Sequence, residues 1–385
     1  MEVYLDNAAT TPVKEEVVKA VVRALEKEYG NPSSLHSKGV EVEKSIKAIR
    51  KSIAKALGCL DQEIYFTSGG TEANNIAIRG IVEANKRAGN HIITTKIEHP
   101  SVLNTFKELE AKGYEVTYLN VDAEGFIALE ELSDCIKANT ILVSIMQVNN
   151  EVGSIQPIEE IAKLIKQKNK QVLFHVDAIQ SFGKLKLKVE DLQVDSLSIS
   201  GHKIHAPKGI GALYVKKDTK IIPIITGGGQ EMGLRVGTEN VPGIYGLGEA
   251  VQLIMQDQQS YINKLNENKR YFLKILKEKV RDVNILSPIK DSFAPHIISV
   301  AFMGVKSEVL LHSLEQEGVY VSSGSACSSK KKGFSHVLTA MKLKEAVIDS
   351  TIRFSVSDAT TAKELDYAVE KINHQVTMLR KIMKR

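Results

Sequence analysis

The sequence predicts an α/β fold, with a large domain on a mainly parallel sheet and a smaller α+β domain after it. Seven short apolar segments within the first 215 residues have the composition of buried strands. Helical patterns alternate with the earlier segments, as expected for a parallel sheet. Beyond residue 241 the pattern changes to long helices and then to mixed strands and helices, which indicates the second unit.

The expected strands of the large domain, most of them rich in Ile, Val and Leu, are Glu63–Thr67, His91–Thr95, Val116–Val121, Ile141–Val148, Val172–Val176, Ser196–Ser200 and Ile210–Val215. The helices expected between the earlier strands are Glu72–Ala88, Ser101–Lys112, Leu129–Ile136 and Ile158–Lys168. Ligands of such sheets bind outside the carboxyl ends of the strands. The residues directly after each strand are therefore the candidates for a site.

The second unit follows long helices, which the apolar spacing predicts from Val241 to about Val280. Its expected elements are a strand at Ile297–Phe302, a helix near Glu308–Glu317, a strand at Val319–Ser322, a Ser/Gly/Lys loop, a strand at Thr351–Ser355 and a helix from Ala362. This mixture predicts a smaller α+β domain of about 100–130 residues.

The composition excludes several classes of protein. The 385 residues contain 51 Lys and Arg against 46 Asp and Glu, no Trp and only 5% aromatics, so no stacking platform for nucleic acid is expected. No apolar run reaches the roughly 18–20 residues of a membrane span, and the N-terminus lacks signal-peptide features. Three cysteines without a CxxC motif argue against disulfides and structural zinc, and indicate a reducing, cytoplasmic location.

Small and polar residues follow the first expected strand. Gly69, Gly70 and Thr71 open the next helix there. Free backbone N–H groups, a hydroxyl and the positive end of the helix dipole would together bind an anion such as phosphate. An ordinary helix N-cap would have the same residues. The sequence contains no GxxxxGK[ST] motif and no well-placed GxGxxG, so a nucleoside triphosphate or a dinucleotide is not the favoured ligand.

Polar side chains also follow the next two strands considered. His99 could cover a flat ligand, although a surface histidine before a helix would look the same. Asn149, after the Ile141–Val148 strand, could orient a ligand carboxylate or phenolic oxygen. Asparagine is equally common in turns, so this signal alone is weak.

Two charged residues follow the fifth and sixth expected strands, Val172–Val176 and Ser196–Ser200. Asp177 directly follows an apolar strand. Burial of a carboxylate there costs free energy unless it meets a cation or hydrogen-bond donors. It would either form a structural ion pair or keep a ring nitrogen protonated. Lys203 follows Gly201-His202 at a buried strand end, where burial lowers the pKa of an amine and makes it nucleophilic. A surface lysine whose charge reaches water is the alternative.

Each of these signals is weak, but together they specify one ligand. A phosphate cradle, a cover for a flat ring, an acid for a ring nitrogen and a lysine for a carbonyl carbon all fall at successive strand ends. Pyridoxal phosphate is the cofactor that uses all four.

Several segments resemble the NifS/IscS-type cysteine desulfurases, essentially from end to end of the chain. The segments that carry the resemblance are Leu5–Pro12, Gly30–His36, His175–Gln180, Ser200–Lys203, Gly227–Glu231 and Ser322–Ser329. The resemblance implies a class V aminotransferase fold, which is pyridoxal phosphate-dependent fold type I, and a homodimer. It also implies a large domain of residues 14–255 and a small domain of residues 1–13 and 256–385.

Carried over by position, the resemblance implies a role for each strand-end residue. Lys203 would hold the cofactor covalently, His99 would stack on its ring and relay protons, Asp177 would pair with the ring nitrogen and Gln180 would hydrogen-bond the ring hydroxyl. The phosphate would be bound by Gly70, Thr71, Ser200 and His202, and in the other subunit by Thr238.

The substrate carboxylate would be bound by Asn149 and Arg353. A planar guanidinium suits bidentate binding of a carboxylate, and apolar Ile352 and Phe354 flank it.

Cys327 narrows the expected chemistry. It lies in a Ser, Gly, Ala and Lys segment, Ser322–Gly333, without a large apolar anchor, which is typical of an exposed reactive thiol rather than a packed one. The resemblance implies that Cys327 takes sulfur from L-cysteine as a persulfide, that L-alanine is released, and that the sulfur passes to an acceptor such as an iron–sulfur scaffold or a tRNA-thiolation carrier.

Other functions remain open from the sequence. A selenocysteine lyase or a plain aminotransferase would use the same fold. From another class, His202-x-x-His205 could belong to a metal-dependent hydrolase, although no Glu lies between the histidines. A non-catalytic interaction module could use Lys184–Lys188, although alternating Lys and Leu more simply predicts a half-exposed strand.

Overall fold

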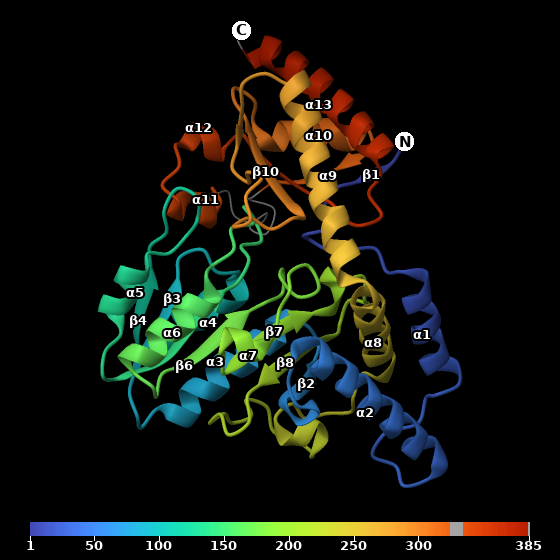
Figure 1. The fold of residues 1–385 in the computed structure, drawn as a ribbon, viewed down its shortest axis with the longest axis vertical. Helices are drawn as coiled ribbons and strands as arrows, with labels where there is room; N and C mark the ends of the chain where they lie inside the picture. The colour runs from blue at the N-terminus through green and yellow to red at the C-terminus, as the bar shows by residue number, and fades with distance from the viewer. Residues whose placement is uncertain (324–333, 384–385) are drawn as a thin grey trace.

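The computed structural model describes residues 1–323 and 334–383 of the chain (Figure 1). Cys327 and most of its expected loop therefore lie outside the described residues. Figure 1 shows two lobes, with the larger sheet in the lower one and both chain termini in the upper one. No helix in the described part of the chain is both long and apolar enough to cross a membrane.

A seven-stranded sheet in the order β2-β8-β7-β6-β5-β3-β4 forms the centre of the lower lobe. Its strands are β2 (Ile64–Thr67), β3 (His91–Thr95), β4 (Glu115–Leu119), β5 (Thr140–Met146), β6 (Leu173–Asp177), β7 (Ser196–Ser200) and β8 (Gly211–Val215). Only β8 runs antiparallel to its two neighbours; the other pairs are parallel. The prediction of a mainly parallel sheet is confirmed, and the carboxyl ends of β3, β5, β6 and β7 share one edge.

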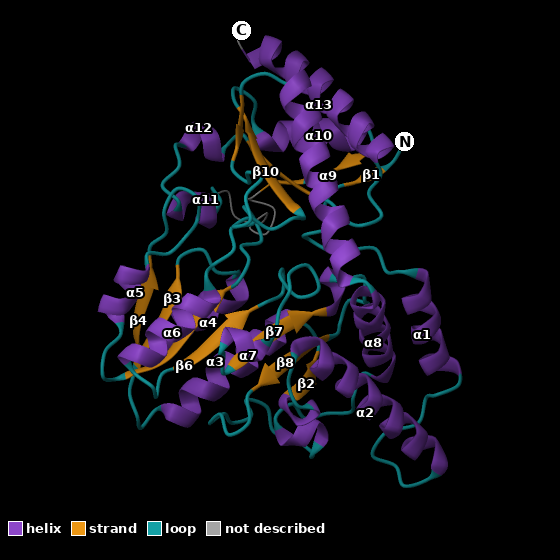
Figure 2. Ribbon diagram, in the orientation of Figure 1, coloured by secondary structure: helices purple, strands orange, loops and turns teal. Residues whose placement is uncertain are grey.

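Helices pack around this sheet (Figure 2). They are α3 (Gly70–Asn85), α4 (Pro100–Ala111), α5 (Leu129–Cys135), α6 (Ile158–Lys168), α7 (Val189–Leu192) and α8 (Val241–Gln256). Two further helices, α1 (Glu15–Glu26) and α2 (Ser37–Leu57), pack against α8. They precede the first strand of the sheet, so the strand–helix alternation gives no signal for them.

The upper lobe contains a four-stranded antiparallel sheet in the order β12-β13-β10-β9. These strands are β9 (Val283–Ile285), β10 (Ile297–Phe302), β12 (Ser322–Ser323) and β13 (Thr351–Ser355). The helices are α9 (Gln258–Lys279), α10 (Ser307–Gln316), α11 (His336–Ala340), α12 (Glu345–Ile348) and α13 (Ala362–Met383). The N-terminal strand β1 (Val3–Tyr4) pairs in parallel with β11 (Val319–Tyr320), which attaches the start of the chain to its last third.

Two expectations are wrong in detail. The segment Val319–Ser322 is not one strand, because β11 and β12 belong to different sheets. The segment Lys184–Lys188 is not a strand either, and Lys184 is buried rather than half-exposed. Alternation of Lys and Leu mimics a strand pattern, but this segment continues the turn after β6 and its backbone bonds locally, from Lys184 to Ser181.

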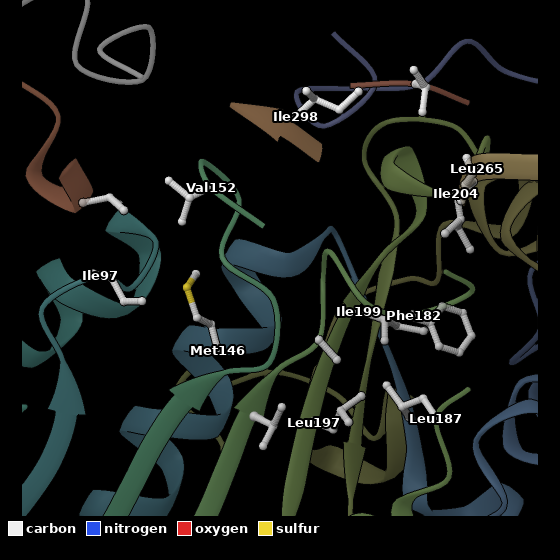
Figure 3. Close-up of a cluster of buried hydrophobic side chains, with 14 of the residues drawn as sticks. Ile97, Met146, Val152, Phe182, Leu187, Leu197, Ile199, Ile204, Leu265 and Ile298 are labelled. Carbon is white, nitrogen blue, oxygen red and sulfur yellow. The ribbon is translucent and has the colours of Figure 1, made fainter. Parts of the chain in front are cut away.

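One continuous apolar core joins the two lobes. Figure 3 shows Leu197 and Ile199 of β7 below, with Leu265 of α9 and Ile298 of β10 above them. All four side chains are essentially excluded from water. Burial of this kind stabilises the folded protein by about 1.5–3 kcal/mol for each large aliphatic side chain. The upper lobe is therefore packed against the carboxyl edge of the large sheet, where the candidate site lies.

Candidate active site

A cavity of about 650 Å³ lies at the carboxyl edge of the large sheet. Its size is that of a pocket for a small organic molecule. Nine of the residues singled out from the sequence line it together: Gly70, Thr71, His99, Asp177, Gln180, Ser200, His202, Lys203 and Arg353. The N-terminal segment supplies further lining residues that were not among the candidates: Asp6, Ala8, Ala9 and Thr10.

The turn between β2 and α3 forms one end of the cavity. Gly69 has φ +151°, a backbone conformation that favours glycine. A Cβ atom on Gly70 would lie 2.0 Å from Cδ1 of Ile179, so a larger residue here would have to displace the Ile179 side chain that follows β6. Since α3 starts here and Ser200 and Thr71 line the same end, this turn offers helix N-terminal N–H groups and hydroxyls, which suit a phosphate.

Asp177 is the last residue of β6 and is almost fully buried in the cavity wall. Its Oδ2 accepts a hydrogen bond from Nδ2 of Asn74 at 2.8 Å, and its Oδ1 accepts one from the backbone N–H of Ile179 at 3.0 Å. Burial raises the pKa of Asp177, and these donors and the positive charge of Lys203 oppose that rise. A cationic ring nitrogen in the cavity would supply a further stabilising charge.

His99 lies at the N-cap of α4, after β3, and is half-buried. Its Nδ1 accepts a hydrogen bond from the backbone N–H of Ser101 at 3.1 Å. Burial is the main cause that lowers the pKa of His99, with the charge of Asp177 acting in the opposite direction. The ring is therefore neutral at physiological pH and lies against the cavity.

Lys203 follows β7 in a single turn of 3₁₀-helix, Gly201–Lys203. Its Nζ donates hydrogen bonds of 2.7 Å to the backbone carbonyls of Ala8 and Ala9. Gln180 donates from Nε2 to the same Ala8 carbonyl at 2.9 Å. The small residues of the N-terminal segment thus bring backbone oxygens next to the amine.

Arg353, on β13, closes the cavity from the upper lobe and is 6% exposed. Its guanidinium donates at 2.8 Å to Oδ1 of Asp6 and at 2.8 Å to the carbonyl oxygen of Asn150. Its buried Nε makes no hydrogen bond within the described residues. A fixed guanidinium with remaining donor capacity suits the carboxylate of a small substrate.

Three candidates do not line this cavity. Asn149 is fully buried, and its amide is used within its own turn, since Oδ1 accepts from the N–H groups of Glu151 and Val152. Its neighbour Asn150 lines the cavity, and the contact of Asn149 with a substrate stays a prediction. Thr238 is exposed and does not line the cavity of its own chain. Cys327 lies outside the described residues.

His202 and His205 do not converge. Nδ1 of His202 lies 3.2 Å from Oγ1 of Thr10, whereas His205 contacts the Pro12 carbonyl through Nδ1. Burial, reinforced by the charge of Lys203, lowers the pKa of His202 to about 4. Within residues 1–323 and 334–383, no group of three or more His, Cys, Asp and Glu side chains could hold a metal ion. The alternative of a metal-dependent hydrolase gains no support from this pair.

The donor set fits pyridoxal phosphate, because a glycine turn, a buried carboxylate, a histidine ring and a lysine amine all face one cavity of suitable size. The mainly parallel sheet with these groups at its carboxyl edge defines the class: a pyridoxal phosphate-dependent enzyme of fold type I. The chain belongs to the family described as aminotransferase class-V, whose family model matches residues 3–368.

Known proteins are similar over nearly the whole chain. A relative from Dictyoglomus turgidum, described as cysteine desulfurase IscS, is 44% identical over 381 residues, which cover 99% of this chain and 96% of the relative. A solved structure titled NifS-like protein superposes with a TM-score of 0.92 at 38% identity, covering 98% of this chain and 100% of that one. A structure titled SspA in complex with cysteine has a TM-score of 0.83 at 37% identity, covering 93% and 100%.

Proposed function

We propose that this chain is a cysteine desulfurase that removes sulfur from L-cysteine with pyridoxal phosphate and releases L-alanine. The observation that carries the proposal is the convergence of Lys203, Asp177 and Arg353 on one cavity, in a chain so similar to a cysteine desulfurase. The relative that was solved in complex with cysteine supports the choice of substrate.

The residues that would hold the cofactor follow from the cavity. The turn at Gly70 and Thr71, together with Ser200 and His202, would bind its phosphate. Asp177 would hold its ring nitrogen in the protonated state, and Lys203 would hold it covalently. When bound, the cofactor supplies an electron sink for charge that develops at the α-carbon of an amino acid.

The proton at the substrate α-carbon requires a base, and Lys203, which lines the cavity, would act as that base. Two backbone carbonyls fix its Nζ in the cavity, within hydrogen-bond distance. His99 is neutral, lines the same cavity and would serve as a second proton carrier. The upper lobe contributes Ser322 and Arg353 to the cavity wall, and exclusion of water by a bound ligand would strengthen the electrostatic interactions inside it.

Arg353→Lys tests the carboxylate site. Lysine keeps the charge opposite Asp6 but loses the planar pair of donors, so we expect KM for L-cysteine to rise about 10- to 100-fold with a smaller change in kcat. Steady-state kinetics on the cofactor-loaded enzyme measure both constants. The matched control is Arg79→Lys on α3, whose guanidinium binds Glu108 away from the cavity. Unchanged KM in Arg353→Lys would exclude the proposed contact.

A homodimer is the proposed assembly, and α1 supports it. The buried residues Val17 and Ala24 face α8, yet Val18, Val22 and Leu25 form an exposed stripe at helical spacing on the same helix, 41–59% exposed. An apolar stripe of this kind marks a protein–protein interface. Exposed Thr238 would then reach the phosphate site of the other subunit.

The dimer proposal predicts the effect of a charge in this stripe. Leu25→Glu should convert the dimer to a monomer and weaken retention of the cofactor about tenfold or more, because each site would lose its Thr238 contact. Sedimentation velocity and dialysis against buffer measure the two effects. The control is Val309→Glu, which places a charge at an exposed position of α10 in the upper lobe. A dimer that persists in Leu25→Glu would place the interface elsewhere.

The activity itself is tested by product analysis. Protein loaded with pyridoxal phosphate should convert L-cysteine to L-alanine in stoichiometric amounts with the sulfur released. Formation of a keto acid instead of alanine would identify an aminotransferase. A strong preference for selenocysteine over cysteine would identify a selenocysteine lyase.

The sulfur would pass through a persulfide on Cys327 to an acceptor protein. An iron–sulfur scaffold and a tRNA-thiolation carrier both fit this chemistry, and a reducing cytoplasm would keep the thiol available. Incubation with L-cysteine and then with a purified acceptor, followed by mass spectrometry of both proteins, would show whether the sulfur moves.

A further inference from the structure

A row of buried polar side chains lies behind the cavity and links four elements of the large lobe. Its members, called here the buried polar row, are Ser196 on β7, His175 on β6, Asn74 on α3, Ser101 on α4 and His99 at the start of α4. The first three are completely buried and Ser101 is 8% exposed. Polar groups at such positions are costly unless they are fully hydrogen-bonded, so their arrangement carries information.

The direction of the hydrogen bonds at Asn74 is fixed by Asp177. The carboxylate can only accept, so the Asn74 atom at 2.8 Å from it is the amide nitrogen Nδ2, which also donates to Oγ of Ser101 at 3.0 Å. The remaining amide atom, Oδ1, lies 3.1 Å from Nε2 of His175. Since an amide oxygen only accepts, this histidine carries its proton on Nε2.

The far end of the row is compatible with this assignment, because the Ser196 hydroxyl can donate or accept. Nδ1 of His175 lies 2.9 Å from Oγ of Ser196, and without a proton it accepts from that hydroxyl. Burial lowers the pKa of His175 to about 3, so the ring stays neutral and keeps one donor and one acceptor nitrogen. Asn74 is therefore locked in one amide orientation by a donor on one side and an acceptor on the other.

At the His99 end of the buried polar row, the backbone of α4 fixes the direction of the hydrogen bonds. The N–H group of Ser101 can only donate, so Nδ1 of His99 at 3.1 Å is an acceptor and carries no proton. The Ser101 hydroxyl already accepts from Asn74, and it lies 2.9 Å from the same Nδ1, to which it donates. The single proton of the neutral His99 ring is consequently on Nε2.

We propose that Asn74 is a positioning residue that, with His175 and Ser101, sets the direction of the hydrogen bonds on two sides of the cavity at once. Toward Asp177 it presents a donor, which keeps that carboxyl group an acceptor for a protonated ring nitrogen. Through Ser101 it directs the hydroxyl proton to Nδ1 of His99, which reinforces the Nε2–H form that the backbone N–H of Ser101 already favours. The consequence for catalysis rests on the proposed function; the hydrogen-bond directions do not.

The first test needs no activity. In cofactor-free full-length protein labelled with ¹⁵N-histidine, long-range proton–nitrogen spectra at neutral pH report which ring nitrogen carries the proton. His175→Gln and His99→Gln assign the two rings by the loss of their signals. We expect both rings to carry their proton on Nε2 and none on Nδ1. A proton on Nδ1 of either ring would overturn the proposed directions.

The second test uses an isosteric change, Asn74→Asp, which replaces the donor to Asp177 by an oxygen. We expect the affinity for pyridoxal phosphate, followed by absorbance titration, to fall about 10- to 100-fold, as for loss of a hydrogen bond to a charged group. Asn85→Asp, at the far end of the same helix, is the control and should bind as the wild type does. Wild-type affinity in Asn74→Asp would overturn this inference, whereas a wild-type protein that binds no cofactor would overturn the proposed function.

A third test uses two variants of His175 to separate the orientation of the Asn74 amide from the packing of the buried ring. It decides the question if Asn74→Asp does not fold. His175→Gln keeps an N–H group that can donate to Asn74, and His175→Leu does not. We expect His175→Leu to lower kcat about fivefold or more and to change the absorbance spectrum of the bound cofactor, and His175→Gln to restore both toward the wild type. Equal behaviour of the two variants, with unchanged thermal stability, would exclude the orienting role.

Discussion

Replacing Lys203 with alanine will lower the turnover of L-cysteine by at least about a thousandfold, because the same amine is the proposed covalent anchor and the proposed base. Borohydride reduction of the wild type should fix the cofactor on the peptide that contains Lys203, and the variant should release its cofactor on dialysis. Mass spectrometry of the digested protein and quantification of alanine measure these effects.

The control for this prediction is Lys216→Ala, an exposed lysine directly after β8. It should retain both the reducible linkage and the turnover. Because Nζ of Lys203 donates to the carbonyls of Ala8 and Ala9, the alanine variant also loses two hydrogen bonds, worth about 1–3 kcal/mol of stability in total. A thermal melt shows that the protein is still folded. A Lys203→Ala enzyme with normal turnover would refute the assigned role.

Replacing Cys327 with serine will lower alanine formation from L-cysteine by at least about a hundredfold while the cofactor remains bound, because the hydroxyl is a far weaker nucleophile toward sulfur than a thiolate. After incubation with L-cysteine, the wild-type Cys327 peptide should carry one additional sulfur atom. Absorbance spectra report the retained cofactor, and mass spectrometry reports the sulfur.

The chain offers two matched controls, Cys59→Ser and Cys135→Ser. Burial, with help from neighbouring acids, raises the pKa of the Cys59 thiol to about 12 and also raises that of Cys135. Neither forms an appreciable thiolate near neutral pH, so both variants should keep full activity. Sulfur found on Cys59 or Cys135, or full turnover in Cys327→Ser, would contradict the assignment of the acceptor thiol.

Much of the fold could be predicted because its signals are local. The bounds of β3, β7 and α6 agree with the expected segments to the residue, since each is a short apolar or amphipathic run between clear breakers. The strand ends then located Asp177 and Lys203 without any knowledge of their neighbours. Helices α1 and α2 were not expected, because their pattern precedes the alternation that indicated the sheet.

The choice between Asn149 and Asn150 shows where sequence reasoning stops. Both follow β5 and both are asparagine, so composition does not distinguish them. The turn rotates the first into the protein, where it bonds the N–H groups of Glu151 and Val152, and leaves the second at the cavity. Only the backbone path decides which of the two amides lines the cavity.

By itself, the sequence determined which chemical groups stand at the ends of the strands, because strand limits depend on residues that are adjacent in the chain. Tertiary structure alone decided their neighbours: Asp6 beside Arg353, and Asn74 between Asp177 and Ser101. These partners are up to 347 positions apart, and no local preference encodes such pairings. The Asn74 contacts arise when α3 packs on the sheet and on α4. The pairing of Asp6 with Arg353 arises because the folded chain brings its start and its end together at the carboxyl edge of the sheet.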